Sequence, residues 1–184
     1  PAYPSWEELE VFLDRGVRIK RLREDALLEH VHWATTRRHQ WDEVCALALD
    51  HRSQLEEMAA EAEVGADRIS RFKELGLEAI LRVKAARGFT VGTLLDGRYG
   101  QTALFEAQRH DMWIGRPVER PGACIKSWGE STPLGVEIGT WPRNHVAKCL
   151  IFYNTSDPEA LKAQQIAEMH RLHTAARQSG HEFV

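Results

Sequence analysis

The sequence predicts an α/β fold with a parallel sheet, and within that class about the first five strands of a (β/α)8 TIM barrel. From Trp41 onward, apolar runs alternate with amphipathic helical stretches, a pattern typical of βαβ units. No Gly-x-Gly-x-x-Gly motif follows the first apolar run, as a doubly wound dinucleotide-binding sheet would require. Charged residues follow several predicted strands instead, where a barrel places its active site. These observations favour a partial barrel over a doubly wound sheet.

The expected strands are short apolar runs bounded by turn residues or charged residues. They cover residues 44–49, 91–95, 113–119 and 146–153, with a short extra strand over 134–138 and a last strand that opens at Glu182. The first run is continuously apolar, which predicts a strand buried on both faces. The run over 146–153 is the strongest strand candidate in the chain.

The expected helices connect these strands. They cover residues 54–62, 67–87, 101–109 and 158–178. The second carries an apolar stripe formed by Ile69, Phe72, Leu75, Ile80 and Val83. The last begins with Pro at its first position and ends before Gly180, which are common start and stop signals.

Residues 1–40 differ in character from residues 41–184, and the sequence predicts a helical linker or the tail of a preceding domain there. Ser5 can cap a helix, and a basic stretch follows it. A whole barrel has about 250 residues, so we expect the chain to be part of a longer polypeptide, with residues 41–184 forming the first part of the barrel.

Composition excludes several classes of protein. The chain has 184 residues, 43% of them hydrophobic, and its 24 basic and 27 acidic side chains give a net charge of −3. This charge offers no general attraction to nucleic acid, and no apolar run reaches the roughly 18 residues of a membrane span. The three cysteines are widely spaced, which fits a reducing compartment. We therefore expect a cytoplasmic protein without nucleic-acid or membrane partners.

Charged pairs follow three of the predicted strands, and each pair alone is typical of an ion pair that fastens a loop to the sheet. The pairs are Asp50 with Arg52, Asp96 with Arg98, and Arg116 with Glu119. Three pairs at one sheet edge favour a shared polar site. We expect Asp96 and the three arginines to bind an anionic substrate, because a guanidinium matches phosphate or carboxylate with two parallel hydrogen bonds.

Lys148 lies within an apolar run, where a lysine is rarely placed without a partner. A desolvated lysine has a depressed pKa and can attack a carbonyl as an amine nucleophile. Two other interpretations remain open: a buried ion pair with Asp96 or Glu119, or a charged auxiliary to another nucleophile.

Histidine pairs give only a weak indication of a metal. His170 and His173 are three residues apart on a predicted helix, and His30 and His32 flank Val31. Neither pair has a third ligand at a diagnostic spacing. We expect no metal and no cofactor.

Four motifs together resemble one family. They are ALDHRSQL (48–55), LLDGRYG (94–100), RPVERPG (116–122) and KCLIFY (148–153). They resemble the aldolase-like domain fused behind a sugar kinase in the bifunctional 5-dehydro-2-deoxygluconokinase of bacterial myo-inositol catabolism. The first, second and fourth are also similar to motifs of the tagatose-bisphosphate aldolases, which are lysine-dependent class I barrels.

The resemblance implies retro-aldol cleavage of 6-phospho-5-dehydro-2-deoxygluconate to dihydroxyacetone phosphate and malonate semialdehyde. Lys148, Asp50 and Glu119 would be catalytic, with the carboxylates shuttling protons. Lys148 matches the auxiliary strand lysine of the aldolases; the imine-forming lysine and the phosphate site would lie beyond Val184. We therefore expect residues 1–184 alone to be inactive as an aldolase. They also contain no kinase motifs, so no kinase activity is assigned to them.

Two other functions stay open. The domain can bind a sugar phosphate without chemistry and serve the kinase as a regulatory or dimerising module. It can also be a metal-dependent aldolase or isomerase that uses histidines. An open half-barrel exposes strand edges, which recruit other chains, so we expect a homo-oligomer.

Overall fold

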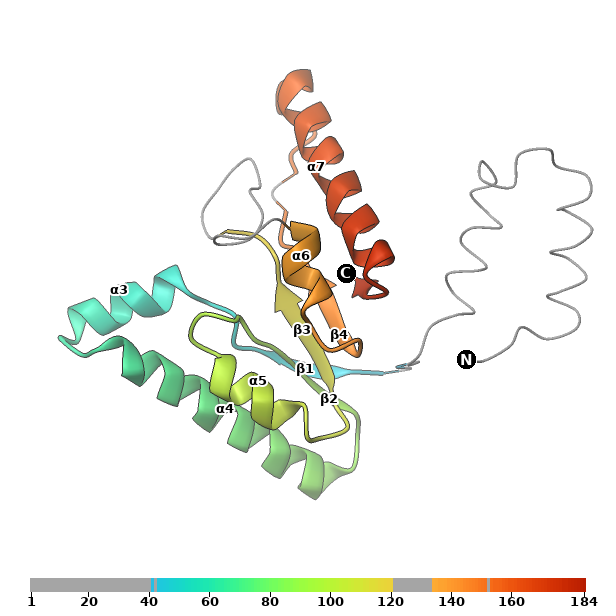
Figure 1. The fold of residues 1–184 in the computed structure, drawn as a ribbon. Helices are drawn as coiled ribbons and strands as arrows, with labels where there is room; N and C mark the ends of the chain where they lie inside the picture. Colours follow the sequence, from blue (N-terminus) through green and yellow to red (C-terminus); the bar gives the residue numbers. More distant parts are fainter. Residues whose placement is uncertain (1–40, 42, 121–133, 152) are drawn as a thin grey trace, which may run out of the picture. The chain divides into compact units, whose positions relative to one another are not determined.

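The computed structural model describes residues 41, 43–120, 134–151 and 153–184. The chain divides into two units between Gln40 and Trp41, and the described residues belong to the second, Trp41–Val184 (Figure 1). The linker predicted over residues 1–40 lies outside the described residues.

Five parallel strands form a single sheet in chain order, β1-β2-β3-β4-β5. They are β1 (Cys45–Ala48), β2 (Val91–Leu94), β3 (Trp113–Pro117), β4 (His145–Lys148) and β5 (Glu182–Phe183). A doubly wound sheet reverses its strand order at a switch point, and this order does not reverse. The predicted α/β class with a parallel sheet is confirmed.

Helices connect the strands. They are α3 (Ser53–Glu61), α4 (Ala66–Arg87), α5 (Gln101–Ala107), α6 (Leu134–Gly139) and α7 (Glu159–Gln178). The four predicted helices correspond to α3, α4, α5 and α7. Helix α4 ends at Gly88, whose φ of +72° lies in the left-handed region that glycine adopts without strain.

Two hydrophobic clusters join the helices to one face of the sheet. In the first, Ile114 of β3 packs with residues of α4 and α5; in the second, Val118 packs with residues of α6 and α7. Ile114 and Val118 are an even number of positions apart, so their side chains leave the sheet on the same side. The described helices α4 to α7 therefore cover the same face, and Figure 1 shows α4 beside α5 and α6 beside α7.

Helix α4 lies very close to the end of β1, and Gly76 permits this approach. A Cβ added at Gly76 would lie 2.6 Å from a methyl carbon of Leu49. This proximity also brings Lys73, which lies three residues before Gly76 on α4, to the loop that follows β1.

Strand β1 is exposed, which corrects the expected burial on both faces. All four of its residues are exposed. The reason is its place at the edge of the sheet: among the described residues β1 pairs only with β2. An apolar run indicates burial on both faces only when other elements lie on both sides of it.

Two other predicted strands differ from the structure. The run 134–138 is helix α6, whose Ile138 and Leu134 both contact the second hydrophobic cluster. A short apolar run fits either a helix or a strand. The run predicted over 146–153 is strand only to Lys148.

Helix α4 buries Ile69 and Ile80 of the predicted stripe but not its other three residues. Its buried residues are Ile69, Lys73, Leu77 and Ile80. Phe72, Leu75 and Val83 are exposed. None of the described helices combines the length and apolar character that a bilayer span requires.

Candidate active site

Three charged side chains meet beyond the carboxyl ends of the strands. The ammonium of Lys148, the last residue of β4, lies 2.9 Å from Oδ2 of Asp50 and 3.3 Å from Oε1 of Glu119. Asp50 follows β1, and Glu119 follows β3. We call Asp50, Glu119 and Lys148 the carboxylate cluster.

Local sequence explains why these side chains share one face. Each directly follows a residue that is buried against the helices: Leu49, Val118 and Ala147. Successive side chains of an extended chain point to opposite faces. Lys148, which lies within β4, therefore points to the face of the sheet that the described helices leave uncovered, and its contacts with Asp50 and Glu119 place their carboxylates beside it.

The two carboxylates keep Lys148 charged. Burial acts to lower the pKa of the Lys148 ammonium, but its hydrogen bond to Asp50 and the charges of Glu119 and Asp50 outweigh burial and raise it. This corrects the depressed pKa expected for a desolvated lysine. The side chain of Lys148 remains 18% exposed, so the cluster is accessible to a solute.

The backbone of Glu119 is fixed by a hydrogen bond, and one oxygen of its carboxylate accepts no hydrogen bond from the described residues. Nη2 of the buried Arg52 donates a 2.8 Å hydrogen bond to the Glu119 carbonyl. Oε2 of Glu119 is buried and accepts no hydrogen bond from the described residues. A buried acceptor without a donor is costly in a folded protein, so this oxygen is suited to a substrate hydroxyl.

Asp96 lies in a separate buried pair. One of its oxygens binds the ammonium of Lys73, a residue of α4 that is not among the predicted site residues. Its Oδ1 accepts hydrogen bonds from the backbone amides of Arg98 and Tyr99, at 2.9 and 2.8 Å. Asp96 thus organises the loop after β2 and does not contact the carboxylate cluster.

Arg98 and Arg116 also lie outside the carboxylate cluster. Arg98 is half-exposed, stacks over the Tyr99 ring and pairs with Glu56 at 3.0 Å. Arg116 lies on the helix-covered side, with its guanidinium carbon 4.1 Å from the centre of the Trp141 ring. Burial lowers the pKa of Arg116 to about 10, against the opposing charges of Glu137 and Asp96.

Two histidines are buried near Arg116. Nε2 of His145 lies 2.7 Å from Oε1 of Gln108. Burial, with the charges of Arg116 and His181, lowers the pKa of His145 to about 4. Burial also lowers the pKa of His181, whose Nε2 lies 3.1 Å from the Pro142 carbonyl. Both imidazoles are therefore neutral near pH 7.

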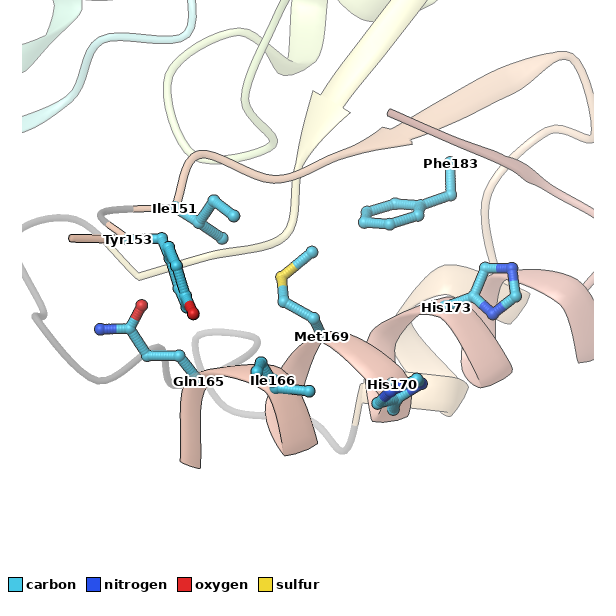
Figure 2. Close-up of a pocket in the computed structure, with 8 residues that line it drawn as sticks. All are labelled: Ile151, Tyr153, Gln165, Ile166, Met169, His170, His173 and Phe183. Carbon is cyan, nitrogen blue, oxygen red and sulfur yellow. The ribbon is translucent and has the colours of Figure 1, made fainter. Parts of the chain in front are cut away.

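A separate apolar pocket lies between α7 and the segments that flank it (Figure 2). Its volume is about 290 Å³. Figure 2 shows Met169 between Ile151 and Phe183, with His170 and His173 along α7. The pocket contains no member of the carboxylate cluster. Across the described part of the chain, no three His, Cys, Asp or Glu side chains are grouped to hold a metal ion.

A sequence signal for Lys73 exists on α4. Ile69, Lys73, Leu77 and Ile80 follow the spacing of one helix face. A lysine inside such a stripe is a buried-charge candidate, just as Lys148 is inside an apolar strand. The predicted apolar stripe included Phe72 and Leu75 instead of Lys73, so it did not indicate that Lys73 is buried.

Comparison with known proteins gives one family. A family model described as "Uncharacterized protein conserved in bacteria (DUF2090)" matches residues 8–184. No curated protein matches the chain.

Proposed function

The chain belongs to the DUF2090 family of proteins conserved in bacteria, and we propose that it forms part of a class I-type aldolase. The proposed reaction is cleavage of a phosphorylated keto-sugar acid, 6-phospho-5-dehydro-2-deoxygluconate, to dihydroxyacetone phosphate and malonate semialdehyde. The carboxylate cluster is the observation that carries the proposal. It provides an acceptor for a substrate proton beside a fixed positive charge, at the strand ends where a barrel enzyme works.

We further propose that the five-stranded sheet belongs to a (β/α)8 barrel. Its consecutive parallel strands and the helices on one face support this interpretation. On that interpretation the uncovered face of the sheet would be the barrel interior, and the carboxylate cluster would lie at its catalytic end.

In this reaction an amine condenses with the substrate ketone, and the iminium accepts the electron pair of the breaking carbon–carbon bond. We assign to Glu119 the acceptance of the proton from the substrate hydroxyl that becomes the aldehyde, because its Oε2 is buried and accepts no hydrogen bond from the described residues. Lys148 stays protonated and balances one of the two carboxylate charges. The phosphate of the substrate would bind outside the carboxylate cluster, as the resemblance implies. The imine-forming amine would come from a later strand, as the resemblance implies.

Trapping of the imine tests this proposal. The natural polypeptide that carries this sequence is treated with dihydroxyacetone phosphate and borohydride, and the adduct is mapped by mass spectrometry of its peptides. We expect an adduct on a lysine other than Lys73 or Lys148, and we expect a K148M variant to form it at the same position. Loss of activity on treatment with a chelator would overturn the class I mechanism.

A second function is supported by the same protonated lysine. The ammonium of Lys148 and the carboxylates beside it can hydrogen-bond the hydroxyls of a sugar phosphate without chemistry, in a module attached to a kinase. Dihydroxyacetone phosphate would then raise the melting temperature by mass action, while no adduct and no cleavage product form. An adduct on Lys148 itself would instead make this residue the nucleophile.

A further inference from the structure

The loop that follows β1 is held from three directions. Asp50 binds the Lys148 ammonium at 2.9 Å. The carbonyl of His51 accepts a 2.9 Å hydrogen bond from Nζ of Lys73. Arg52 donates to the Glu119 carbonyl at 2.8 Å. Consecutive residues of the loop thus contact β4, α4 and the segment after β3.

Lys73 is built into the core of the unit. It lies on α4 between the buried residues Ile69 and Leu77, and its side chain is 0% exposed. Its ammonium binds both Asp96, in the loop after β2, and the His51 carbonyl, in the loop after β1. Lys73 therefore connects the two loops from its position on α4.

Stability alone does not account for a lysine at this position. Replacing a buried ion pair by well-packed apolar residues is often neutral or stabilising. An apolar side chain, however, cannot donate a hydrogen bond to the His51 carbonyl. That bond constrains the backbone adjacent to Asp50, whose carboxylate must meet Lys148.

We propose that Lys73 is a positioning residue for the carboxylate cluster, which acts through the His51 carbonyl to hold Asp50 against Lys148. Its place in catalysis rests on the proposed aldolase function. The positioning itself is a property of the fold and can be measured without any reaction.

The main test uses the double variant K73M/D96N. It removes the bond to His51 without leaving the charge of Asp96 unpaired, and the side-chain carbonyl of the introduced asparagine can still accept the amides of Arg98 and Tyr99. The matched control is K84M, on the same helix, whose lysine binds the carbonyl of Asp111 and contacts no member of the carboxylate cluster.

The first readout is the titration of Lys148, followed by the Cε resonance in protein labelled with ¹³C-lysine. The charged groups that face Lys148 are Asp50 and Glu119. We expect its midpoint in K73M/D96N to fall by at least about 0.5 pH unit, because a displaced Asp50 stabilises the ammonium less. K84M should titrate like the unmodified protein. An unchanged midpoint in K73M/D96N would overturn the proposal.

The second readout is turnover of the sugar acid. We expect kcat to fall about 10- to 100-fold with KM changed less than about threefold, as for a misplaced catalytic group. In a D50N background the same double substitution should cause no further loss, whereas a purely structural role would give an additive loss. If the unsubstituted protein does not cleave the sugar acid, the aldolase proposal fails, and the Lys148 titration still decides the role of Lys73.

Discussion

Lys148 and Lys73 each bind an aspartate in the same unit, and their pKa values shift in opposite directions. Burial acts against both charges. At Lys148 the hydrogen bond to Asp50 and the charges of two carboxylates outweigh burial and raise the pKa. At Lys73, which is fully buried, burial outweighs the bond to Asp96 and lowers it. The charge of Asp50 also acts to raise the pKa of Lys73, and the charge of Arg52 opposes it. Two carboxylates thus act on each lysine, and burial from water decides the sign.

The comparison extends to the two faces of the sheet. On the helix-covered side burial lowers the pKa of Arg116, His145 and His181. On the uncovered face the carboxylate cluster maintains a charged lysine near water. The helix-covered side thus keeps its two histidines neutral near pH 7, whereas the uncovered face holds a charged lysine between two carboxylates near water.

The largest expected effect tests the uncovered face. Substitution of Glu119 by Gln removes the proposed proton acceptor, and we expect kcat to fall about 1,000-fold, within the range for loss of a general base. The measurement is steady-state cleavage of the phosphorylated sugar acid by the natural polypeptide. E74Q, at a surface position on α4, is the matched control. Full activity in E119Q would remove Glu119 from the mechanism.

The next effect compares the two lysines in stability. K73M leaves Asp96 buried and unpaired, so we expect a loss of about 3 kcal/mol in the free energy of unfolding. K148M should cost less, about 2 kcal/mol, because Lys148 remains 18% exposed and Asp50 11% exposed, so water partly solvates the charges left behind. Urea unfolding at pH 7 measures both. Equal losses would show that access to water does not distinguish the two sites.

The loss of stability in acid tests the burial of His145 on the helix-covered side. The folded pKa of His145 is about 4, below its ordinary value of 6.5. The unfolded state therefore binds more protons between these values, and stability falls as pH drops from 6.5 towards 4. We expect His145 to contribute about 2 kcal/mol to this loss. Urea unfolding across this range should show a smaller loss in H145Q, and an equal loss would contradict a neutral buried His145.

Much of the fold follows from local pattern. The helices α3, α4, α5 and α7 could be predicted because their spacing and caps are local features. The burial of β1 could not, because it depends on which elements lie beside it in space. The same holds for the run 134–138, where a short apolar segment fits helix or strand until its packing is known.

The carboxylate cluster could be predicted in part from the sequence. Asp50, Glu119 and Lys148 each follow an apolar residue at a strand end, and alternation then assigns them to one face. Arg116 lies three positions before Glu119, so alternation also assigns it to the opposite face. Which groups touch Lys148 depends on the register of the strands, and the contacts of Lys73 depend on how α4 packs.

The smallest expected change in stability concerns the exposed edge of the sheet. Leu47 of β1 is 45% exposed, and Val44 beside this strand is also exposed. An apolar edge strand favours pairing with another chain, and an edge lysine opposes it. In a closed barrel β1 would pair with the last strand, so we expect self-association through β1 only of the isolated unit 41–184, in which no described strand covers that edge. L47K should weaken self-association in sedimentation velocity, while unfolding changes by less than about 0.5 kcal/mol.

A matched substitution makes this last test specific. Leu150 is exposed to a similar extent, at 49%, but follows β4 and lies away from the β1 edge. L150K should therefore leave self-association as it is in the unsubstituted protein. Equal weakening by both variants would indicate a general effect of charge, and a monomeric unsubstituted protein would exclude association through β1. Weakening by L47K alone would assign the exposed apolar edge to contact between copies.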